Sequence, residues 1–226
     1  MAASDENISR GNRLKYNALA FFTAAMWGLT FVSTKVLILN GLSPLWIFIL
    51  RFIIAYLFIL AIAHKELWAK SLKDELWMVV LGMTGGSVYF ICENTALTYT
   101  FASNVSLIIC ATPVLTLFLC GLFFHQKIRF TAIIGAVMAL CGVTMIILNG
   151  SLNFGLSPIG DLLTLLAALL WAIYCILVKK MNGRYSNLFI TRKVFFYGFA
   201  TALLFSIFEP LPTMPAAESI PAIILN

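Results

Sequence analysis

The sequence predicts an all-α protein, a polytopic bundle of transmembrane helices. Of its 226 residues, 62% are hydrophobic and 11% are charged, and the mean hydropathy is +0.98. Soluble domains average about 45–50% apolar and about 25% charged residues. The apolar residues form runs of about 18–24, which are long enough to cross a bilayer. Because the charges lie between these runs and not in one patch, the net charge of +6 does not indicate a nucleic-acid partner.

The apolar runs define about seven expected spans, namely Tyr16 to Leu39, Pro44 to Ala63, Leu76 to Thr98, Asn104 to Phe124, Phe130 to Leu148, Asp161 to Val178 and Leu188 to Phe208. The first run is longer than the apolar core of about 7–15 residues in a cleavable signal peptide, so we interpret it as a retained signal anchor. All five cysteines lie inside apolar runs without CxxC spacing. No disulfide framework, metal site or cofactor is therefore expected.

Basic residues alternate along the connectors of this bundle. They occur in the N-terminal tail and in the second, fourth and sixth connectors, whereas the first, third, fifth and seventh connectors contain none. By the positive-inside rule the N-terminus is cytoplasmic, as in an integral protein of the cytoplasmic (inner) membrane. Arg192 and Lys193, near the start of the last span, are expected to snorkel to the cytoplasmic surface. Lys35 and Arg51 lie deeper and need another explanation.

Two segments of the chain resemble each other. Trp27 precedes Lys35 by eight residues, as Trp171 precedes Lys179, and the tetrapeptide at Ser43 has an echo at Ser186 after a one-residue gap. The offset spans five helices, and an odd number of spans inverts the second copy, a construction that is common in secondary transporters. We therefore expect a cytoplasmic tail (1–15), a first five-helix repeat (16–149) and a partial second repeat (150–226). In the alternative interpretation, the two tryptophans are ordinary buried side chains.

Three ionisable residues fall at a similar depth in the outer half of the membrane. A rise of about 1.5 Å per residue places Lys35, Arg51 and Glu93 about 6–10 Å from the outer ends of their helices. One interpretation is a structural Arg51–Glu93 pair with Lys35 snorkelling outward. The other is an anion-attracting cavity, in which Glu93, next to Asn94, also takes up and releases a proton. Both interpretations can hold for one cluster.

Glycine and proline indicate how the middle spans are built. Gly82 and Gly86 form a GxxxG pair that permits close helix packing, and Glu93 follows two turns later on the same face. We therefore expect the Glu93 carboxylate to face protein and not lipid. Pro113 is expected to kink the fourth span near the bilayer midplane, with the Thr112 hydroxyl satisfying a freed carbonyl or contacting substrate. Signatures of intramembrane enzymes such as HExxH or GxSxG are absent from the sequence.

These residues together resemble the EamA domain of the drug/metabolite transporter superfamily. The resemblance is carried by Trp27-Gly28-x-x-Phe31, Arg51-Phe52, the run from Glu93 to Ser103, Pro113, and Gly160-Asp161 before Trp171. It implies ten helices in two inverted repeats, a central cavity, and export of small metabolites, amino acids or drugs, often driven by protons. The chain departs from the family pattern at His125-Gln126-Lys127, where family members often carry a glutamate.

The leading hypothesis is a secondary transporter that exports small metabolites by alternating access, with the lipid bilayer and possible coupling protons as its other partners. Its candidate site residues are Trp27, Lys35, Arg51, Glu93, Asn94, Thr112, Pro113 and Trp171. The segment Ser219 to Asn226 resembles the opening of an eighth span, so C-terminal truncation is expected. The alternative is a non-transporting fragment or a helical partner subunit.

Overall fold

A computed structural model describes residues 10–64, 66–124, 130–148 and 157–210, and this part of the chain is almost wholly helical. Its elements are α1 (Arg10–Leu39), α2 (Pro44–Ile62), α3 (Leu72–Gly82), the π-helical turn η1 (Met83–Ser87), α4 (Val88–Tyr99), α5 (Ala102–Ile109), α6 (Thr112–Phe124), α7 (Phe130–Leu148), α8 (Pro158–Met181) and α9 (Asn187–Ser206). Six helical stretches of the described residues are long and apolar enough to cross a membrane. The helix α7 occupies the fifth expected span. The predicted all-α transmembrane bundle is confirmed.

Capping residues extend the third and sixth spans into the polar sequence before their expected starts. The third span starts at Leu72, four residues before Leu76, since the Ser71 side chain accepts a hydrogen bond from the Asp74 amide at 3.1 Å. The sixth starts at Pro158 instead of Asp161, with Ser157 as its N-cap and proline in the first turn.

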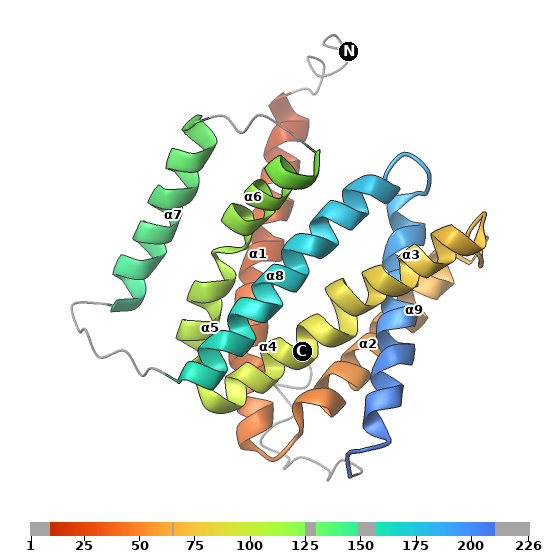
Figure 1. The fold of residues 1–226 in the computed structure, drawn as a ribbon, viewed down its shortest axis with the longest axis horizontal. Coiled ribbons are helices and arrows are strands. Elements are labelled where there is room, and N and C mark those ends of the chain that lie inside the picture. The colour runs from red at the N-terminus through yellow and green to blue at the C-terminus, as the bar shows by residue number, and fades with distance from the viewer. Residues whose placement is uncertain (1–9, 65, 125–129, 149–156, 211–226) are drawn as a thin grey trace.

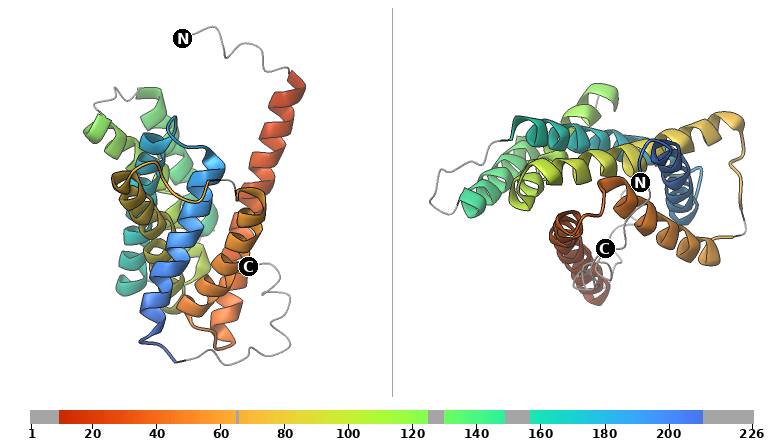
Figure 2. Two further views of the ribbon diagram at one scale, coloured as in Figure 1. Left: turned by 90° about the vertical axis from the view of Figure 1, so that its right-hand side faces the viewer. Right: turned by 90° about the horizontal axis from the view of Figure 1, so that it is seen from below.

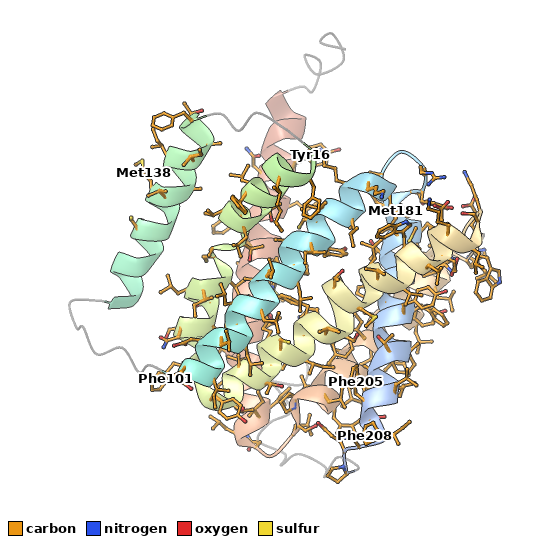
Figure 3. The ribbon with its side chains drawn as sticks, in the orientation of Figure 1. Tyr16, Phe101, Met138, Met181, Phe205 and Phe208 are labelled. Carbon is orange, nitrogen blue, oxygen red and sulfur yellow. The ribbon has the colours of Figure 1, made fainter. Side chains whose placement is uncertain are left out.

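The helices form two groups. The helix α4 packs along α8, and α9 packs against both α2 and α3. Figure 2 shows α1 and α2 on one side of the layer that α3, α4 and α8 form. The helix α7 lies at the edge of the molecule, in contact with α5 and α6 (Figure 1). The largest buried cluster joins α2, α4, α8 and α9 through residues such as Phe48, Phe52 and Tyr89. Figure 3 shows large side chains such as Phe205 and Phe208 projecting from the surface, as expected for a lipid-facing protein.

The third span is broken at η1. Gly86 has φ −126° and ψ −110°, outside the helical region. Around this break the glycines lie directly against neighbouring helices: a Cβ on Gly82 would approach the Tyr197 Cβ to 2.5 Å and the Gly198 amide nitrogen to 2.9 Å. The GxxxG pair therefore permits close packing, as predicted, and the partner helix is α9.

The fourth span is broken between α5 and α6, at Cys110 and Ala111. Pro113 has no N–H to donate to the carbonyl of Ile109, four residues earlier. The Thr112 hydroxyl donates to that carbonyl at 2.6 Å, as the sequence predicted. The expected kink is a two-residue interruption of the helix.

The pairs α1–α2 and α8–α9 are built alike and run in opposite directions (Figure 1). Each pair is joined by a turn with a glycine at positive φ, Gly41 at 89° and Gly183 at 91°. In each, a serine then caps the second helix: Ser43 accepts from the Trp46 amide at 3.4 Å and Ser186 from the Phe189 amide at 3.2 Å. The sequence echo thus corresponds to a shared local structure. The repeat boundaries remain a prediction.

Two sets of expectations lie outside the described residues: the departure from the family pattern at His125-Gln126-Lys127, and the start of an eighth span at Ser219 to Asn226.

Candidate functional site

Trp171, in the middle of α8, lies between two cavities. The first, called here the Trp27 cavity, measures about 750 Å³. The second, the Arg51 cavity, measures about 570 Å³. Trp171 lines both. Each cavity also borders one of the two broken spans, since Thr112 and Pro113 line the first and Gly85 lines the second.

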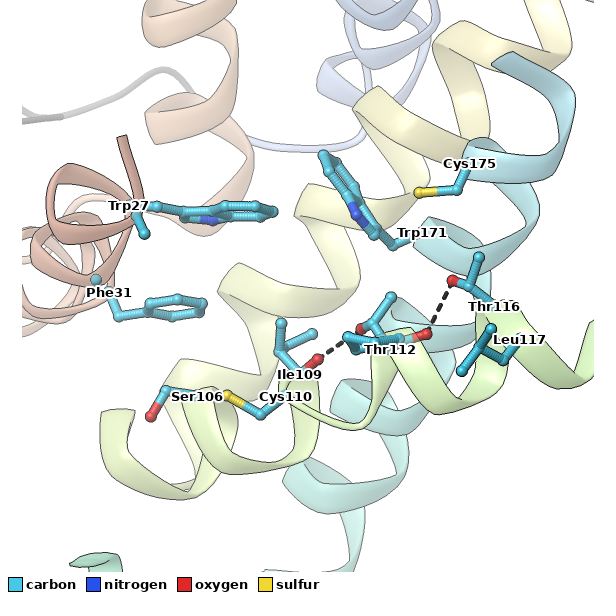
Figure 4. Close-up of a pocket in the computed structure, with 13 residues that line it drawn as sticks. Trp27, Phe31, Ser106, Ile109, Cys110, Thr112, Thr116, Leu117, Trp171 and Cys175 are labelled. Carbon is cyan, nitrogen blue, oxygen red and sulfur yellow. Dashed lines mark hydrogen bonds between the residues drawn. The ribbon is translucent and has the colours of Figure 1, made fainter. Parts of the chain in front are cut away.

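The Trp27 cavity is lined by aromatic, aliphatic and small side chains. Trp27 and Phe31 of α1 form one side of it together with Trp171, and the Trp27 and Trp171 rings are in contact, with their centroids 5.1 Å apart (Figure 4). The opposite wall is the α5–α6 break, where the hydroxyls of Thr112 and Thr116 donate to carbonyls of their own span. The described residues that line this cavity carry no charge. An uncharged, mostly apolar wall can bind the apolar part of a small molecule.

The Arg51 cavity differs because a cation lies in its wall. The guanidinium carbon of Arg51 is 5.1 Å from the centroid of the Phe90 ring. Phe52, Tyr174 and Trp171 complete much of the apolar surface around it. A guanidinium in an apolar pocket can bind a carboxylate or a phosphate.

Glu93 is not among the described residues that line either cavity. It lies behind the wall that Trp171 forms. It is only 4% exposed, so the prediction that this acid faces protein is confirmed. Its carboxylate accepts a hydrogen bond from the Tyr89 hydroxyl at 2.5 Å, and the charge of Arg51 acts on it electrostatically. The Tyr89 and Trp171 ring centroids are 4.9 Å apart. The acid is thus linked to the cavity wall through one tyrosine.

Arg51 acts on Glu93 electrostatically, whereas the Lys35 side chain is directed elsewhere. The Lys35 ammonium donates to the carbonyls of Leu97 and Thr100, at the C-terminal end of α4. A cation there satisfies terminal carbonyls and complements the helix dipole. The buried Asn94 side chain donates to the Pro44 carbonyl at 3.2 Å and so joins α4 to the start of α2.

A second charged cluster, which the sequence interpretation missed, lies at the other end of the third span. Glu75 accepts hydrogen bonds from Lys193, Tyr197 and the Ala69 amide. Asp74, next to it, accepts from Arg184 and from the Tyr185 hydroxyl, both at 2.8 Å.

The expectation that Arg192 and Lys193 snorkel to the surface is wrong, because they are 2% and 3% exposed. Lys193 forms an ion pair with Glu75, and Arg192 donates to the carbonyls of Ala63 and Glu66 at the end of α2. The available signal was the matching depth of opposite charges at the starts of the third and seventh spans. Among the described residues no group of three His, Cys, Asp or Glu side chains is placed to hold a metal ion.

The fold and cavities define a polytopic helical membrane protein with two interrupted spans around a central tryptophan. The sequence profile of the EamA-like transporter family matches residues 14–148, more than half of the chain. The chain belongs to this family, in agreement with the resemblance drawn from its motifs. The relatives that it matches are named as transporters and not as enzymes.

Three curated relatives illustrate the range of sequence identity and coverage. An uncharacterized transporter of Clostridium kluyveri is 26% identical over 80% of this chain and 61% of its own length. The uncharacterized transporter YetK of Bacillus subtilis is 30% identical over 71% of this chain and 50% of its own length. A probable terminal-alkyne amino-acid exporter of Streptantibioticus cattleyicolor is 24% identical over 68% of this chain and 52% of its own length. The chain spans about three-fifths of the length of the first two relatives that it matches.

A solved crystal structure shares the fold. It superimposes with a TM-score of 0.63 at 18% identity, covering 88% of this chain and 71% of the other.

Proposed function

We propose that the protein is a secondary-active transporter that exports small organic metabolites, such as amino acids or related compounds, by alternating access. Membership of the EamA-like family supports transport, and one relative carries the name of an amino-acid exporter. The observation that carries the proposal is the pair of cavities on either side of Trp171, each bordered by an interrupted span. Interrupted helices near the midplane are a recurring feature of transporter binding sites.

In this proposal the Trp27 cavity receives the apolar part of the substrate. Trp27, Trp171, Thr112 and Pro113 form its wall, and the α5–α6 break supplies backbone that can rearrange. Arg51, in the second cavity, attracts an anionic group of the same substrate. Trp171, which contacts both cavities, separates them and moves as the substrate passes.

The proposal includes proton coupling through Glu93. Tyr89 donates a hydrogen bond to Glu93, and its ring lies against Trp171. A change in the protonation of Glu93 can therefore act on the cavity wall through Tyr89. Lys35 and Asn94 hold the end of α4 that carries this acid. Orientation in the cytoplasmic membrane with a cytoplasmic N-terminus, and the two repeats 16–149 and 150–226, belong to the same proposal. The matching turns at Gly41 and Gly183 and the opposite directions of the two helix pairs support the repeats.

The test is flux of labelled amino acids and organic acids in proteoliposomes made with the full chain. Trp171→Ala removes the shared wall, and we expect flux to fall about fivefold, since an aromatic contact is worth about 1 kcal/mol. Leu204→Ala, at an exposed position of α9, is the matched control and is expected to leave flux unchanged. Equal flux in wild type and Trp171→Ala would remove Trp171 from the substrate path.

A non-transporting fragment or helical partner subunit is the competing function. It predicts a folded, monodisperse protein that moves none of the tested solutes across the vesicle membrane. Proton coupling is tested separately with Glu93→Gln, which should flatten the dependence of flux on pH. An unaltered pH profile would remove the proton role while leaving transport itself intact.

A further inference from the structure

A third cavity, of about 350 Å³, lies at the end of the molecule where α2 ends and α9 begins. It is lined by the end of α2, the α2–α3 loop, the α8–α9 turn and the first turns of α9. It shares no lining residue with the two cavities at Trp171. The charged cavity itself is therefore distinct from the two cavities of the proposed transport, although the α2 face beside it carries Ile54 and Phe58, which also line the Arg51 cavity.

This cavity is rich in positive charge. Among the described residues, its wall contains the cations Lys70, Arg184 and Arg192 and the carboxylate Glu66, an excess of two positive charges. Asp74 pairs with Arg184 from outside the wall, which leaves +1. The positive end of the α9 dipole faces the same space, since Ser186, Leu188 and Phe189 of its first turn also line the cavity.

The polar groups are held in place by the fold. Arg192 is 2% exposed and is fixed by the carbonyls of Ala63 and Glu66, two bonds that leave other N–H donors of its five-donor guanidinium. Tyr185 accepts from the Lys70 amide at 2.9 Å and donates to Asp74. Burial, together with the hydrogen bond to Asp74, raises the pKa of Tyr185 and keeps the phenol protonated as that donor.

The surroundings place the cavity at a membrane surface. Trp68 and Leu67, in the same α2–α3 loop, are 70% and 54% exposed, and tryptophan is enriched at the level of lipid headgroups. From the mouth at Ile62, a row of exposed apolar residues continues along α2 through Phe58 to Ile54. These residues are four apart and so share one helix face. A molecule with a charged head and apolar chains fits both features.

We propose that this cavity binds the phosphate headgroup of an anionic phospholipid, with the acyl chains lying over Ile54, Phe58 and Ile62. Arginine and lysine donate to phosphate oxygens, and anionic lipids bind basic pockets at the ends of membrane helices. The apolar row favours a lipid over free phosphate, because free phosphate has no apolar chain that could contact these residues.

Native mass spectrometry of the full chain released from detergent tests the proposal. The probes are phosphatidylglycerol, phosphatidylcholine with the same acyl chains, and glycerol phosphate. We expect one phosphatidylglycerol to be retained, phosphatidylcholine to be retained at least fivefold less, and glycerol phosphate to compete weakly. Equal retention of the two lipids overturns the proposal, and full displacement of phosphatidylglycerol by glycerol phosphate overturns the assignment to a lipid.

Lys70→Gln locates the site, because Lys70 is exposed and belongs to neither of the described ion pairs. Its ammonium lies 3.5 Å from the Arg184 carbonyl oxygen and 5.6 Å from the centroid of the Tyr185 ring. Removing one cation near the phosphate should weaken phosphatidylglycerol retention about five- to tenfold, and Lys70→Arg should restore it. Lys73→Gln, equally exposed and three residues further on, removes the same charge outside the cavity wall and is the control. If Lys70→Gln and Lys73→Gln weaken retention equally, binding is due to general surface charge and the proposal is wrong.

Discussion

The two ends of the third span hold their buried acids in different ways. At its start, Glu75 forms an ion pair with Lys193 and accepts further hydrogen bonds from Tyr197 and the Ala69 amide. Near its end, Glu93 is held by the Tyr89 hydroxyl within its own helix, and Arg51 acts on it while lining a cavity. Glu75 joins α3 to α9, whereas Glu93 connects α4 to the cavity wall.

From this difference we expect a structural role for the Glu75 end of the span, and the proposed proton role belongs to the Glu93 end. The Glu75 cluster joins elements more than a hundred residues apart in sequence, so breaking it should loosen the bundle. The Glu93 group has a local partner and can change protonation with less disturbance of helix packing. The comparison therefore predicts large stability effects at the first end, and smaller ones at the second.

The largest expected effect comes from Lys193→Met. It removes a buried cation and leaves the partly buried Glu75 without its ion-pair partner, which should destabilise the protein by about 3 kcal/mol, measured by denaturant unfolding in micelles. The double variant Glu75→Gln/Lys193→Met should recover most of this loss, because no uncompensated charge remains. A stability equal to wild type for Lys193→Met alone would mean that the ion pair does not hold α3 and α9 together.

The helix contact between the two ends gives the next prediction. In Gly82→Ala the new Cβ meets the backbone of α9, which cannot move aside as a side-chain tip can, so we expect a loss of about 3 kcal/mol in the same unfolding assay. Gly135→Ala, where nothing lies within 4 Å of the new Cβ, is the control and should be neutral or slightly stabilising. Equal effects of the two variants would show that the α3–α9 contact is looser than the structure indicates.

The features that the sequence predicted correctly depend on local chemistry. The spans follow from hydropathy, the break at Pro113 and its Thr112 hydrogen bond from a missing N–H, and the protein-facing Glu93 from helical spacing to Gly86. The serine caps at Ser43 and Ser186 appear as an echo in the sequence, because each cap depends on a single residue at a fixed offset.

The features that it missed depend on rotation about helix axes and on distant partners. Rise per residue gives the depth of Lys35 but not the direction of its side chain, which is toward the end of α4 and not toward Glu93. Asp74 and Glu75 fell outside the expected third span, because hydropathy counts acids as loop residues. Their partners Arg184 and Lys193 are 110 and 118 residues away, and no local pattern connects them.

At the Glu93 end, Tyr89→Phe tests how weakly the acid is held. It removes the hydroxyl that donates to Glu93 and keeps the ring against Trp171, so we expect a loss of about 1.5 kcal/mol, about half of that for Lys193→Met. Tyr99→Phe, at an exposed position of the same helix, serves as the control. A loss as large as that of Lys193→Met would make Glu93 a structural anchor equal to Glu75 and would end the distinction between the two ends.

The smallest effect is expected for Lys35→Met, which removes a cation from the C-terminal carbonyls of α4 but keeps the apolar stem. Capping of this kind is worth about 0.3–1 kcal/mol, so unfolding should shift only slightly, with Lys15→Met at an exposed position as the control. In proteoliposomes the same variant should leave the pH dependence of flux as in wild type, because Lys35 lies on the carbonyls of Leu97 and Thr100 and not on the Glu93 carboxylate. If Lys35→Met shifts that pH dependence as Glu93→Gln does, Lys35 acts on the acid, and the layer of three charges first expected from helix depth is the better description of this end.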